Sequence, residues 1–267
     1  MIVDAYIEGL IGDALIVPVS VNYEKLVDGN FIREQLGTPK RKESFRKAMA
    51  SIWKVLNAKY GLMRIDFNEP FSLRELVNSF KERRTSVPRP IPSSRRLMSR
   101  QSINSTYGIE VIDKHRSLVD NIARHVVYDS CAAMSIMSTN ALAYLLLNKH
   151  RKGATLGELA NSLAELRNHI GTRRDFGFDG ASESVILRAA ELLGDDMIEQ
   201  RKLPNGETFF TPNTLVPNVV ETFYYSNTFV PHIALDAAVV TAIGSSVSET
   251  CPYLTMNDIV DVTMLYC

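Results

Sequence analysis

The sequence has few cysteines and no spacing of residues that would bind a metal ion. Its 267 residues include only three cysteines, Cys131, Cys251 and Cys267, without a C-x-x-C pair. Such usage excludes a disulfide scaffold and a structural zinc site. The five histidines show no H-x-x-x-H or comparable ligand spacing. We therefore expect neither a metal ion nor a resident cofactor.

Net charge of either sign is also lacking, although the charges are unevenly distributed. Residues 1–107 contain 18 Lys/Arg and 11 Asp/Glu, whereas residues 108–267 contain 12 and 19. A basic part beside an acidic part indicates two regions with different neighbours. A basic region suits phosphorylated ligands or an anionic membrane surface, and simple solvation of both regions is the alternative.

No apolar run is long enough to span a membrane comfortably. The uncharged run from Cys131 to Leu147 has 17 residues and includes polar ones, whereas a spanning helix needs about 20 apolar residues. We predict a buried core segment here, within a long helix from about Lys114 to Asn148. A second apolar run, Ile233 to Val247, is interrupted by Asp236.

The first 80 residues alternate between strand and helix patterns, which is typical of an α/β domain. Residues 14–23 predict a buried strand, with Pro18 at an edge or irregularity because proline cannot donate to a β-ladder. Residues 43–59 predict a helix ending near Gly61, and residues 63–67 a second strand. Ser72 opens another predicted helix through a capping box. The apolar side of the helix over 43–59 carries Phe45, Met49, Ile52, Trp53 and Leu56.

Residues 81–106 interrupt this pattern with seven Lys/Arg among prolines and serines, which predicts a flexible basic linker. Residues 107–267 then read as mainly helical. Thr155 opens a capping box, and Ser182 is expected to cap the next helix, which ends at Gly194. The turn Pro204-Asn205-Gly206 predicts a small β-hairpin, and residues 228–247 predict a last helix.

Several short motifs, in a fixed order, resemble one enzyme family. They are Val17-Pro18-Val19-Ser20-Val21-Asn22-Tyr23, Glu34-Gln35-Leu36-Gly37, Arg64-Ile65-Asp66-Phe67, Arg174-Asp175-Phe176 and Phe209-Phe210-Thr211-Pro212. Together they are similar to the glycerol-3-phosphate acyltransferases of the mitochondrial type. The resemblance implies that residues 1–80 are an α/β remnant of the acyltransferase domain, which begins at the family's fourth motif. Residues 107–267 then correspond to a truncated, mainly α-helical C-terminal region with a small β-hairpin.

The resemblance also implies an activity and its partners. The family transfers an acyl group from acyl-CoA to the 1-hydroxyl of glycerol-3-phosphate, forming lysophosphatidate for phospholipid and triacylglycerol synthesis. The implied partners are acyl-CoA and glycerol-3-phosphate in the full-length enzyme, together with a membrane surface. No cofactor beyond the acyl-CoA substrate and no nucleic acid is implied. The implied location is the mitochondrial outer membrane.

The fourth motif of the family is thought to line the acyl or substrate side of the pocket, which implies substrate-binding roles for Val17, Pro18, Val19 and Tyr23. A plain buried strand is the alternative. The family's catalytic His-x4-Asp and its F-P-E-G-T-R phosphate motif precede the fourth motif, and no F-P-E-G-T-R occurs here. We therefore expect no catalytic residue and no activity from this chain alone. His115 and Asp120 fit the spacing but follow the fourth motif, on a predicted helix where residues five apart point about 140° apart.

Three alternatives remain open from the sequence. The acceptor of the enzyme could be dihydroxyacetone phosphate instead of glycerol-3-phosphate. The basic cluster Lys40-Arg41-Lys42 with Arg46 and Lys47 could bind phosphates or form a solvated surface. Finally, the order of helices and hairpin after Leu142 resembles a non-catalytic winged-helix-like binding module. The third helix of this module has one basic residue, Arg188, and the acidic residue Glu191. So little positive charge disfavours binding of nucleic acid.

Overall fold

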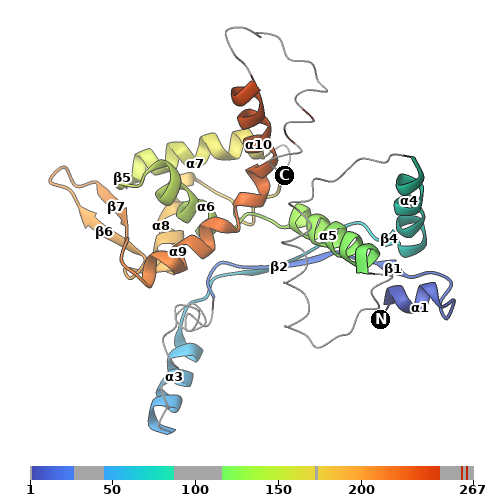
Figure 1. The fold of residues 1–267 in the computed structure, drawn as a ribbon. Coiled ribbons are helices and arrows are strands. Elements are labelled where there is room, and N and C mark those ends of the chain that lie inside the picture. The colour runs from blue at the N-terminus through green and yellow to red at the C-terminus, as the bar shows by residue number, and fades with distance from the viewer. Residues whose placement is uncertain are drawn as a thin grey trace. The chain divides into compact units, whose positions relative to one another are not determined.

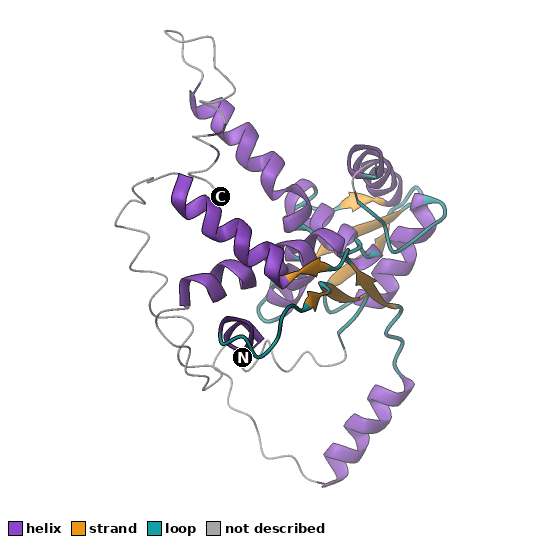
Figure 2. Cartoon of the chain, turned by 90° about the vertical axis from the view of Figure 1, so that its right-hand side faces the viewer, coloured by secondary structure: helices purple, strands orange, loops and turns teal. Residues whose placement is uncertain are grey.

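The computed structural model describes residues 2–26, 45–86, 116–171 and 174–246, with positions 260 and 263. These residues are mainly helical and contain three small β-sheets (Figures 1 and 2). The elements follow one another as α1 (Ile2–Ile7), β1 (Leu15–Ile16), β2 (Val19–Tyr23), α3 (Phe45–Asn57), β3 (Met63–Phe67), β4 (Phe71–Ser72), α4 (Leu73–Ser86), α5 (Arg116–Ala133), α6 (Ser138–Tyr144), the π-helix η2 (Leu145–Lys149), β5 (Ala154–Thr155), α7 (Leu156–Ile170), α8 (Ser182–Leu193), β6 (Ile198–Lys202), β7 (Thr208–Pro212), α9 (Asn218–Asn227) and α10 (Val230–Ser246).

The chain divides into two compact units. The first is drawn from Met1–Ser20 and Phe67–Ala133, and the second from Val21–Asp66 and Met134–Cys267. This grouping cuts across the predicted division of the sequence at residues 81–106, most of which lie outside the described residues. The predicted linker at residues 81–106, and the two regions on either side of it, therefore stay a prediction.

The described part of the first unit contains a small antiparallel sheet and the helices α1, α4 and α5. Strand β1 pairs with β4, with Ile16 opposite Phe71, and the buried residues Leu73, Val77 and Ile122 form its core. The Ser72 hydroxyl accepts a hydrogen bond from the amide of Glu75 at 3.2 Å. This confirms the half of the predicted capping box in which the Ser72 side chain caps the start of α4.

The second unit contains a winged-helix arrangement. Helices α6, α7 and α8 pack together, and a three-stranded antiparallel sheet in the order β5-β7-β6 lies beside them (Figure 1). The predicted hairpin is present as β6 and β7, and β5 adds a third strand that the sequence did not suggest. Thr155 and Glu158 form the predicted reciprocal capping box at the start of α7. The largest fully buried side chains of this core include Leu142, Leu146, Leu159, Leu163, Ile186 and Phe210.

The predicted long helix from Lys114 to Asn148 is wrong. Helix α5 ends at Ala133 and α6 begins at Ser138. Between them the backbone of Ile136 pairs with a distant segment, accepting from Gly177 at 2.8 Å and donating to Asp175 at 3.0 Å. The second half of the uncharged run, from Ala141 to Leu146, contains core residues as predicted.

Smaller differences concern the ends of helices. Ala181, not Ser182, occupies the position before α8, and no side-chain hydrogen bond caps this helix. Gly61 lies beyond the last residue of α3, Asn57, and therefore does not cap that helix. Helix α9 was not predicted, and the expected helix over 228–247 is observed as α10, from Val230 to Ser246.

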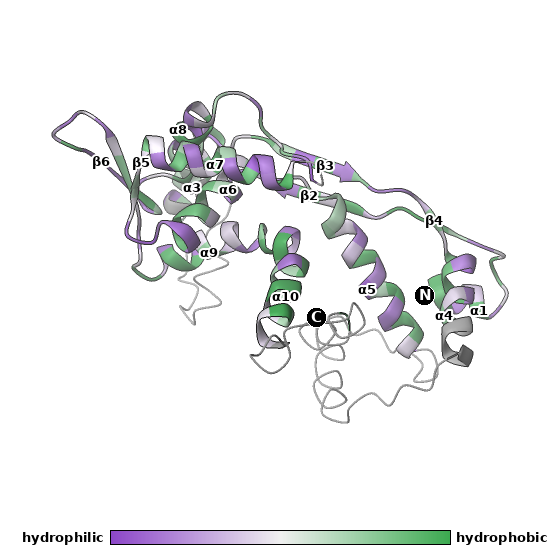
Figure 3. Ribbon diagram, turned by 90° about the horizontal axis from the view of Figure 1, so that it is seen from above, coloured by the Kyte–Doolittle hydropathy of each residue, from purple (hydrophilic) through white to green (hydrophobic). Residues whose placement is uncertain are grey.

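Helix α10 is the most apolar exposed helix of the second unit, and hydrophobic colouring covers much of it in Figure 3. Leu235 and Val240 are 59% and 67% exposed. Within the described residues no single helix is long and apolar enough to cross a membrane. Helices α9 and α10 together meet the length and composition criteria, but they are bent by 73° at the break between them.

Candidate functional site

Strand β2 carries the motif for which a substrate-binding role was predicted. The strand alternates, so that Val19, Val21 and Tyr23 are exposed and Ser20 and Asn22 are buried. The expectation of a buried strand over residues 14–23 is therefore wrong for one of its faces, because Val19, Val21 and Tyr23 are 41–46% exposed. Val17, which precedes β2, is also exposed.

Pro18 differs from the other predicted substrate residues. It is buried and lies between β1 and β2, outside both strands, as expected for a residue that cannot donate to a ladder. Its carbonyl accepts a hydrogen bond from the Asn68 amide at 2.9 Å. Val19 and Tyr23 thus share the outward face of β2, whereas Pro18 does not.

The inward face of β2 is polar, and its side chains bind the segment before α6. The Asn22 side-chain amide donates to the Ser135 carbonyl at 2.9 Å and to Asn140 Oδ1 at 3.2 Å. Asn140 Oδ1 also accepts from the Met137 amide at 3.2 Å. These bonds explain why the helix is interrupted here, since the backbone that would continue α5 is held by β2 and by Asn140 instead.

Glu24, directly after β2, is a fully buried carboxylate. Its Oε1 accepts from the Ser138 hydroxyl at 2.8 Å, and its Oε2 accepts from Arg188 Nη2 and from the Leu62 amide, both at 2.8 Å. A buried carboxylate without partners would be very unfavourable, and here both oxygens are hydrogen-bonded. Glu24 therefore joins β2, the start of β3, α6 and α8.

Two further side chains extend this arrangement. Asp66 on β3 accepts from the Ser135 amide at 3.2 Å and from Arg64 Nε at 2.8 Å. The buried Tyr225 hydroxyl accepts from the Leu26 amide at 2.9 Å. Burial raises the pKa of Tyr225 to about 12, so this phenol stays neutral.

We call the whole set of hydrogen-bonded side chains around β2 the polar junction. It comprises Asn22, Glu24, Asp66, Ser135, Ser138, Asn140, Arg188 and Tyr225.

Gly61 is required by the polar junction. Its φ of +71° lies in the left-handed region, and a Cβ at this position would collide with Glu24 Oε2. Only glycine lets the backbone approach the carboxylate this closely. The amide of Leu62, which follows directly, is thereby placed to donate to Glu24.

Helix α8, the third helix of the winged-helix arrangement, contacts the chain itself. Arg188 binds Glu24, and Glu191 forms an exposed ion pair with Lys59 at 2.8 Å. In DNA-binding modules of related shape the recognition helix supplies the contacts to bases. Here the basic side chain of α8 is already paired with a buried carboxylate, so this face suits a protein contact.

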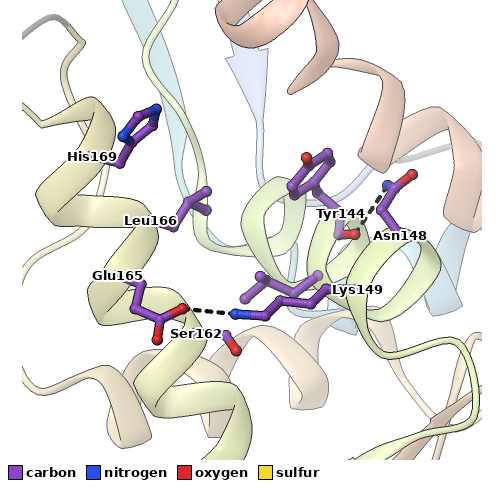
Figure 4. Close-up of a pocket in the computed structure, with 8 residues that line it drawn as sticks. Tyr144, Asn148, Lys149, Ser162, Glu165, Leu166 and His169 are labelled. Carbon is purple, nitrogen blue, oxygen red and sulfur yellow. Dashed lines mark hydrogen bonds and ion pairs between the residues drawn. The ribbon is translucent and has the colours of Figure 1, made fainter. Parts of the chain in front are cut away.

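A hollow of about 410 Å³ lies between η2 and α7 (Figure 4). Lys149 and Glu165 point toward one another across it and form an ion pair at 2.7 Å. The hydrogen bond and the charge of Lys149 lower the pKa of Glu165 from its ordinary value. None of the predicted substrate residues lines this hollow, and its facing charges neutralise each other.

The remaining candidate residues do not form a site within the described residues. His115 and Lys40-Arg41-Lys42 lie outside them, and Arg46 is exposed at the start of α3. The described residues include no group of three or more His, Cys, Asp or Glu that could hold a metal ion.

Sequence reasoning missed Glu24 and the role of Arg188. The available signal was a carboxylate placed directly after an apolar strand, together with one arginine on an otherwise acidic helix. Each charge alone looks like a solvated side chain. Only the fold brings residues 24 and 188 within 2.8 Å of each other.

Comparison with known proteins gives one family. The profile of the family described as "Glycerol-3-phosphate acyltransferase C-terminal region" matches residues 31–263. The proteins named "Glycerol-3-phosphate acyltransferase 1, mitochondrial" of Sus scrofa and Homo sapiens are each 33% identical over 235 residues, which cover 83% of this chain and 28% of each relative. The Mus musculus protein of the same name is 31% identical over 265 residues, covering 94% of this chain and 32% of the relative. The chain spans less than a third of the length of these relatives.

Proposed function

The chain belongs to the glycerol-3-phosphate acyltransferase family, through the C-terminal region of that family, and we propose that it is part of an enzyme of this activity. The reaction transfers an acyl group from acyl-CoA to the 1-hydroxyl of glycerol-3-phosphate and forms lysophosphatidate. The observation that carries the proposal is the extent of the match, since 83–94% of the chain aligns with proteins named for this activity.

The chain contributes a substrate-facing strand to this enzyme. Val19 and Tyr23 are 41% exposed on the outward face of β2, and Val17 precedes them. Apolar side chains on an uncovered strand suit the acyl chain of the donor, which is itself apolar. Pro18 is buried and directly precedes the strand. The polar junction holds β2 in place from behind.

The chemistry requires a histidine base. In an acyl transfer of this kind a histidine removes the proton from the attacking hydroxyl, and it must lie within about 3 Å of that hydroxyl. No histidine belongs to the polar junction. In this proposal the base comes from another part of the enzyme, and the chain by itself is expected to be inactive.

Release of coenzyme A from acyl-CoA is the measurement that tests this proposal. The purified chain with acyl-CoA and glycerol-3-phosphate should release none above the uncatalysed background. A chimera in which the chain replaces the matching region of the Sus scrofa relative should release it, and faster with glycerol-3-phosphate than with dihydroxyacetone phosphate. Release by the chain alone would show that the base lies within it. Preference of the chimera for dihydroxyacetone phosphate would support the related acyltransferase.

The enzyme works at the mitochondrial outer membrane, in this proposal. The relatives are named mitochondrial, and a lipophilic acyl donor favours a membrane location. The exposed apolar residues of α10, including Leu235 and Val240, are suited to the boundary of a lipid surface. Co-sedimentation of the chain with vesicles that contain anionic lipid should fall when both residues are replaced by Asp. Equal binding of the variant and the unchanged chain would contradict a role of α10.

The winged-helix arrangement favours a non-catalytic role inside the same enzyme. Because α8 contacts Glu24 and Lys59 of its own chain, we assign this module to holding β2 and β3. No nucleic acid is part of the proposal, since the basic residue of α8 is already bound to a carboxylate.

A further inference from the structure

The hollow between η2 and α7 combines an apolar wall with a few polar groups that converge on it (Figure 4). Its volume of about 410 Å³ lies within the range of small-molecule sites, which are concave and carry a small number of placed polar groups. Leu145 and Leu166 provide apolar surface, and the Tyr144 ring is held by stacking on Phe229, with 4.3 Å between the ring centroids. A ligand in the hollow therefore meets a wall that is already formed.

One side of α7 faces the hollow and contributes most of its polar groups. The lining residues of this helix follow the i, i+3, i+4, i+7 spacing that places side chains on one face; they are Ser162, Glu165, Leu166 and His169. The Ser162 hydroxyl is only 5% exposed and forms a hydrogen bond with His150 Nε2 at 2.9 Å. Because a hydroxyl oxygen has two lone pairs, Ser162 can still accept a hydrogen bond from a ligand. Together with the Glu165 carboxylate, it forms a place for a cation.

The other wall of the hollow is the wide turn of η2. The His150 amide donates to the Leu145 carbonyl, five residues back, at 2.8 Å. Such π-helical turns are rare and occur frequently at functional sites. The Asn148 side chain donates to Ser226 Oγ at 3.3 Å, which ties the turn to α9. Lys149, the last residue of the turn, extends across the hollow toward α7 (Figure 4), so the two walls carry opposite charges.

The ion pair between Lys149 and Glu165 can open at little cost. Its two atoms lie 2.7 Å apart, but the side chains are 51% and 71% exposed, and exposed ion pairs contribute little to stability. A ligand with a single charge would pair with one of the two residues and leave the other without its partner. A ligand that carries both charges pairs with each of them. The arrangement therefore favours a zwitterion.

We propose that the hollow between η2 and α7 binds a small zwitterion with an apolar side group, of the class of the aliphatic amino acids. Its ammonium group pairs with Glu165 and donates a hydrogen bond to Ser162, and its carboxylate pairs with Lys149. Its side group covers Leu145 and Leu166. This adds a ligand-binding role to the chain and does not depend on the proposed acyl transfer.

Two other classes of ligand fit the hollow less well. A phosphate or another multivalent anion would face the carboxylate of Glu165, and the lowered pKa of that group keeps it charged at neutral pH. An uncharged apolar molecule would cover Lys149 and Glu165 and remove water from both charges without replacing it.

Titration of the isotopically labelled chain, followed by the NMR shifts of its backbone amides, tests the proposal with three probes at neutral pH. L-Leucine carries both charges, L-leucinamide only the positive one and N-acetyl-L-leucine only the negative one. We expect L-leucine to shift the amide signals of η2 and α7 with a dissociation constant below about 1 mM. Each singly charged analogue should bind about fivefold more weakly or worse, because it leaves one charge of the site unpaired.

Two variants separate the charges of the site. Glu165→Gln should weaken the binding of L-leucine by about fivefold and strengthen that of N-acetyl-L-leucine, because the repelling carboxylate is gone. Lys149→Met should weaken L-leucine in the same way and strengthen L-leucinamide. Glu191→Gln is the matched control and should leave the binding of L-leucine unchanged. Glu191 forms an ion pair with Lys59 at 2.8 Å, is 66% exposed and does not line the hollow.

Each outcome decides for or against the zwitterion. Absence of shifts on η2 and α7 at about ten times the expected dissociation constant overturns the proposal. Equal affinity for the three probes overturns it as well, and so does equal binding of L-leucine by the Glu165→Gln and Glu191→Gln variants. Tighter binding of N-acetyl-L-leucine than of L-leucine by the unchanged chain would assign the hollow to an anion instead. The comparison of the three probes needs no variant, so it decides the question even if a substitution disturbs the fold.

Discussion

Glu24 is the residue on which the polar junction depends. Glu24→Ala leaves the Ser138 hydroxyl and the Leu62 amide without their acceptor. Because Arg188 is 49% exposed and can regain water, we expect the free energy of unfolding to fall by about 2–3 kcal/mol, below the range for a fully buried pair. Urea denaturation followed by circular dichroism measures this change.

Two variants serve as controls for Glu24→Ala. Glu24→Gln keeps the shape and one acceptor oxygen, so it should lose about 1 kcal/mol. Glu191→Ala breaks the exposed ion pair with Lys59 and should change stability by less than about 0.5 kcal/mol. If Glu24→Ala were no more destabilising than Glu191→Ala, the junction would not hold the unit together.

His232 makes the second unit sensitive to acid. Burial, and to a lesser degree the charge of Arg174, lower the pKa of His232 to about 4, against 6.5 for the ordinary imidazole. Neither ring nitrogen has a hydrogen-bond partner within the described residues. The unfolded state therefore binds the proton first as pH falls, and stability present above pH 6.5 is lost progressively between pH 6.5 and 4.

The expected loss from His232 between pH 7 and pH 5 is about 1–2 kcal/mol. His232→Leu removes the titrating group, so its stability should change less over this interval than that of the unchanged chain. Unfolding free energies of both proteins at the two pH values give the difference. Parallel losses in the two proteins would show that other groups cause the acid sensitivity.

At the scale of the element, the turn into β3 depends on one glycine. Gly61→Ala forces a side chain into left-handed backbone and against Glu24, so we expect a loss of about 2 kcal/mol or more. Gly157 in α7 is the matched control, since a Cβ there meets nothing within 4 Å. Gly157→Ala should raise stability by up to about 1 kcal/mol. Thermal unfolding measures the stability of both variants. If Gly61→Ala were no more destabilising than Gly157→Ala, the close contact of Gly61 with Glu24 would be refuted.

Element types were largely predictable, whereas their ends and interruptions were not. The spacing of apolar residues predicted α3, α7, α8 and β3, because a helix or strand repeats with a fixed period. The break after Ala133 could not be predicted in this way. It is caused by hydrogen bonds from Asn22 and Gly177, which lie far away in the sequence and leave no periodic signal.

At the scale of the whole molecule, the order of elements carried more information than any one motif. The winged-helix order was visible in the sequence, and the sheet order β5-β7-β6 agrees with it. The partner of α8 was not visible, since a pair such as Glu24 and Arg188 is separated by 164 positions. The substrate-binding roles of Val17, Pro18, Val19 and Tyr23 stay a prediction, although three of these four residues are exposed as that role requires.

The exposed position of Trp53 has a spectroscopic consequence. It is the only tryptophan of the chain, and it lies on the uncovered apolar side of α3, away from the buried core of the helical module. Intrinsic tryptophan emission therefore reports almost nothing about the unfolding of that core. The same emission should be quenched readily by acrylamide in the isolated chain, and it should shift to shorter wavelength when another polypeptide covers α3. The protein thus carries its own fluorescent indicator of assembly.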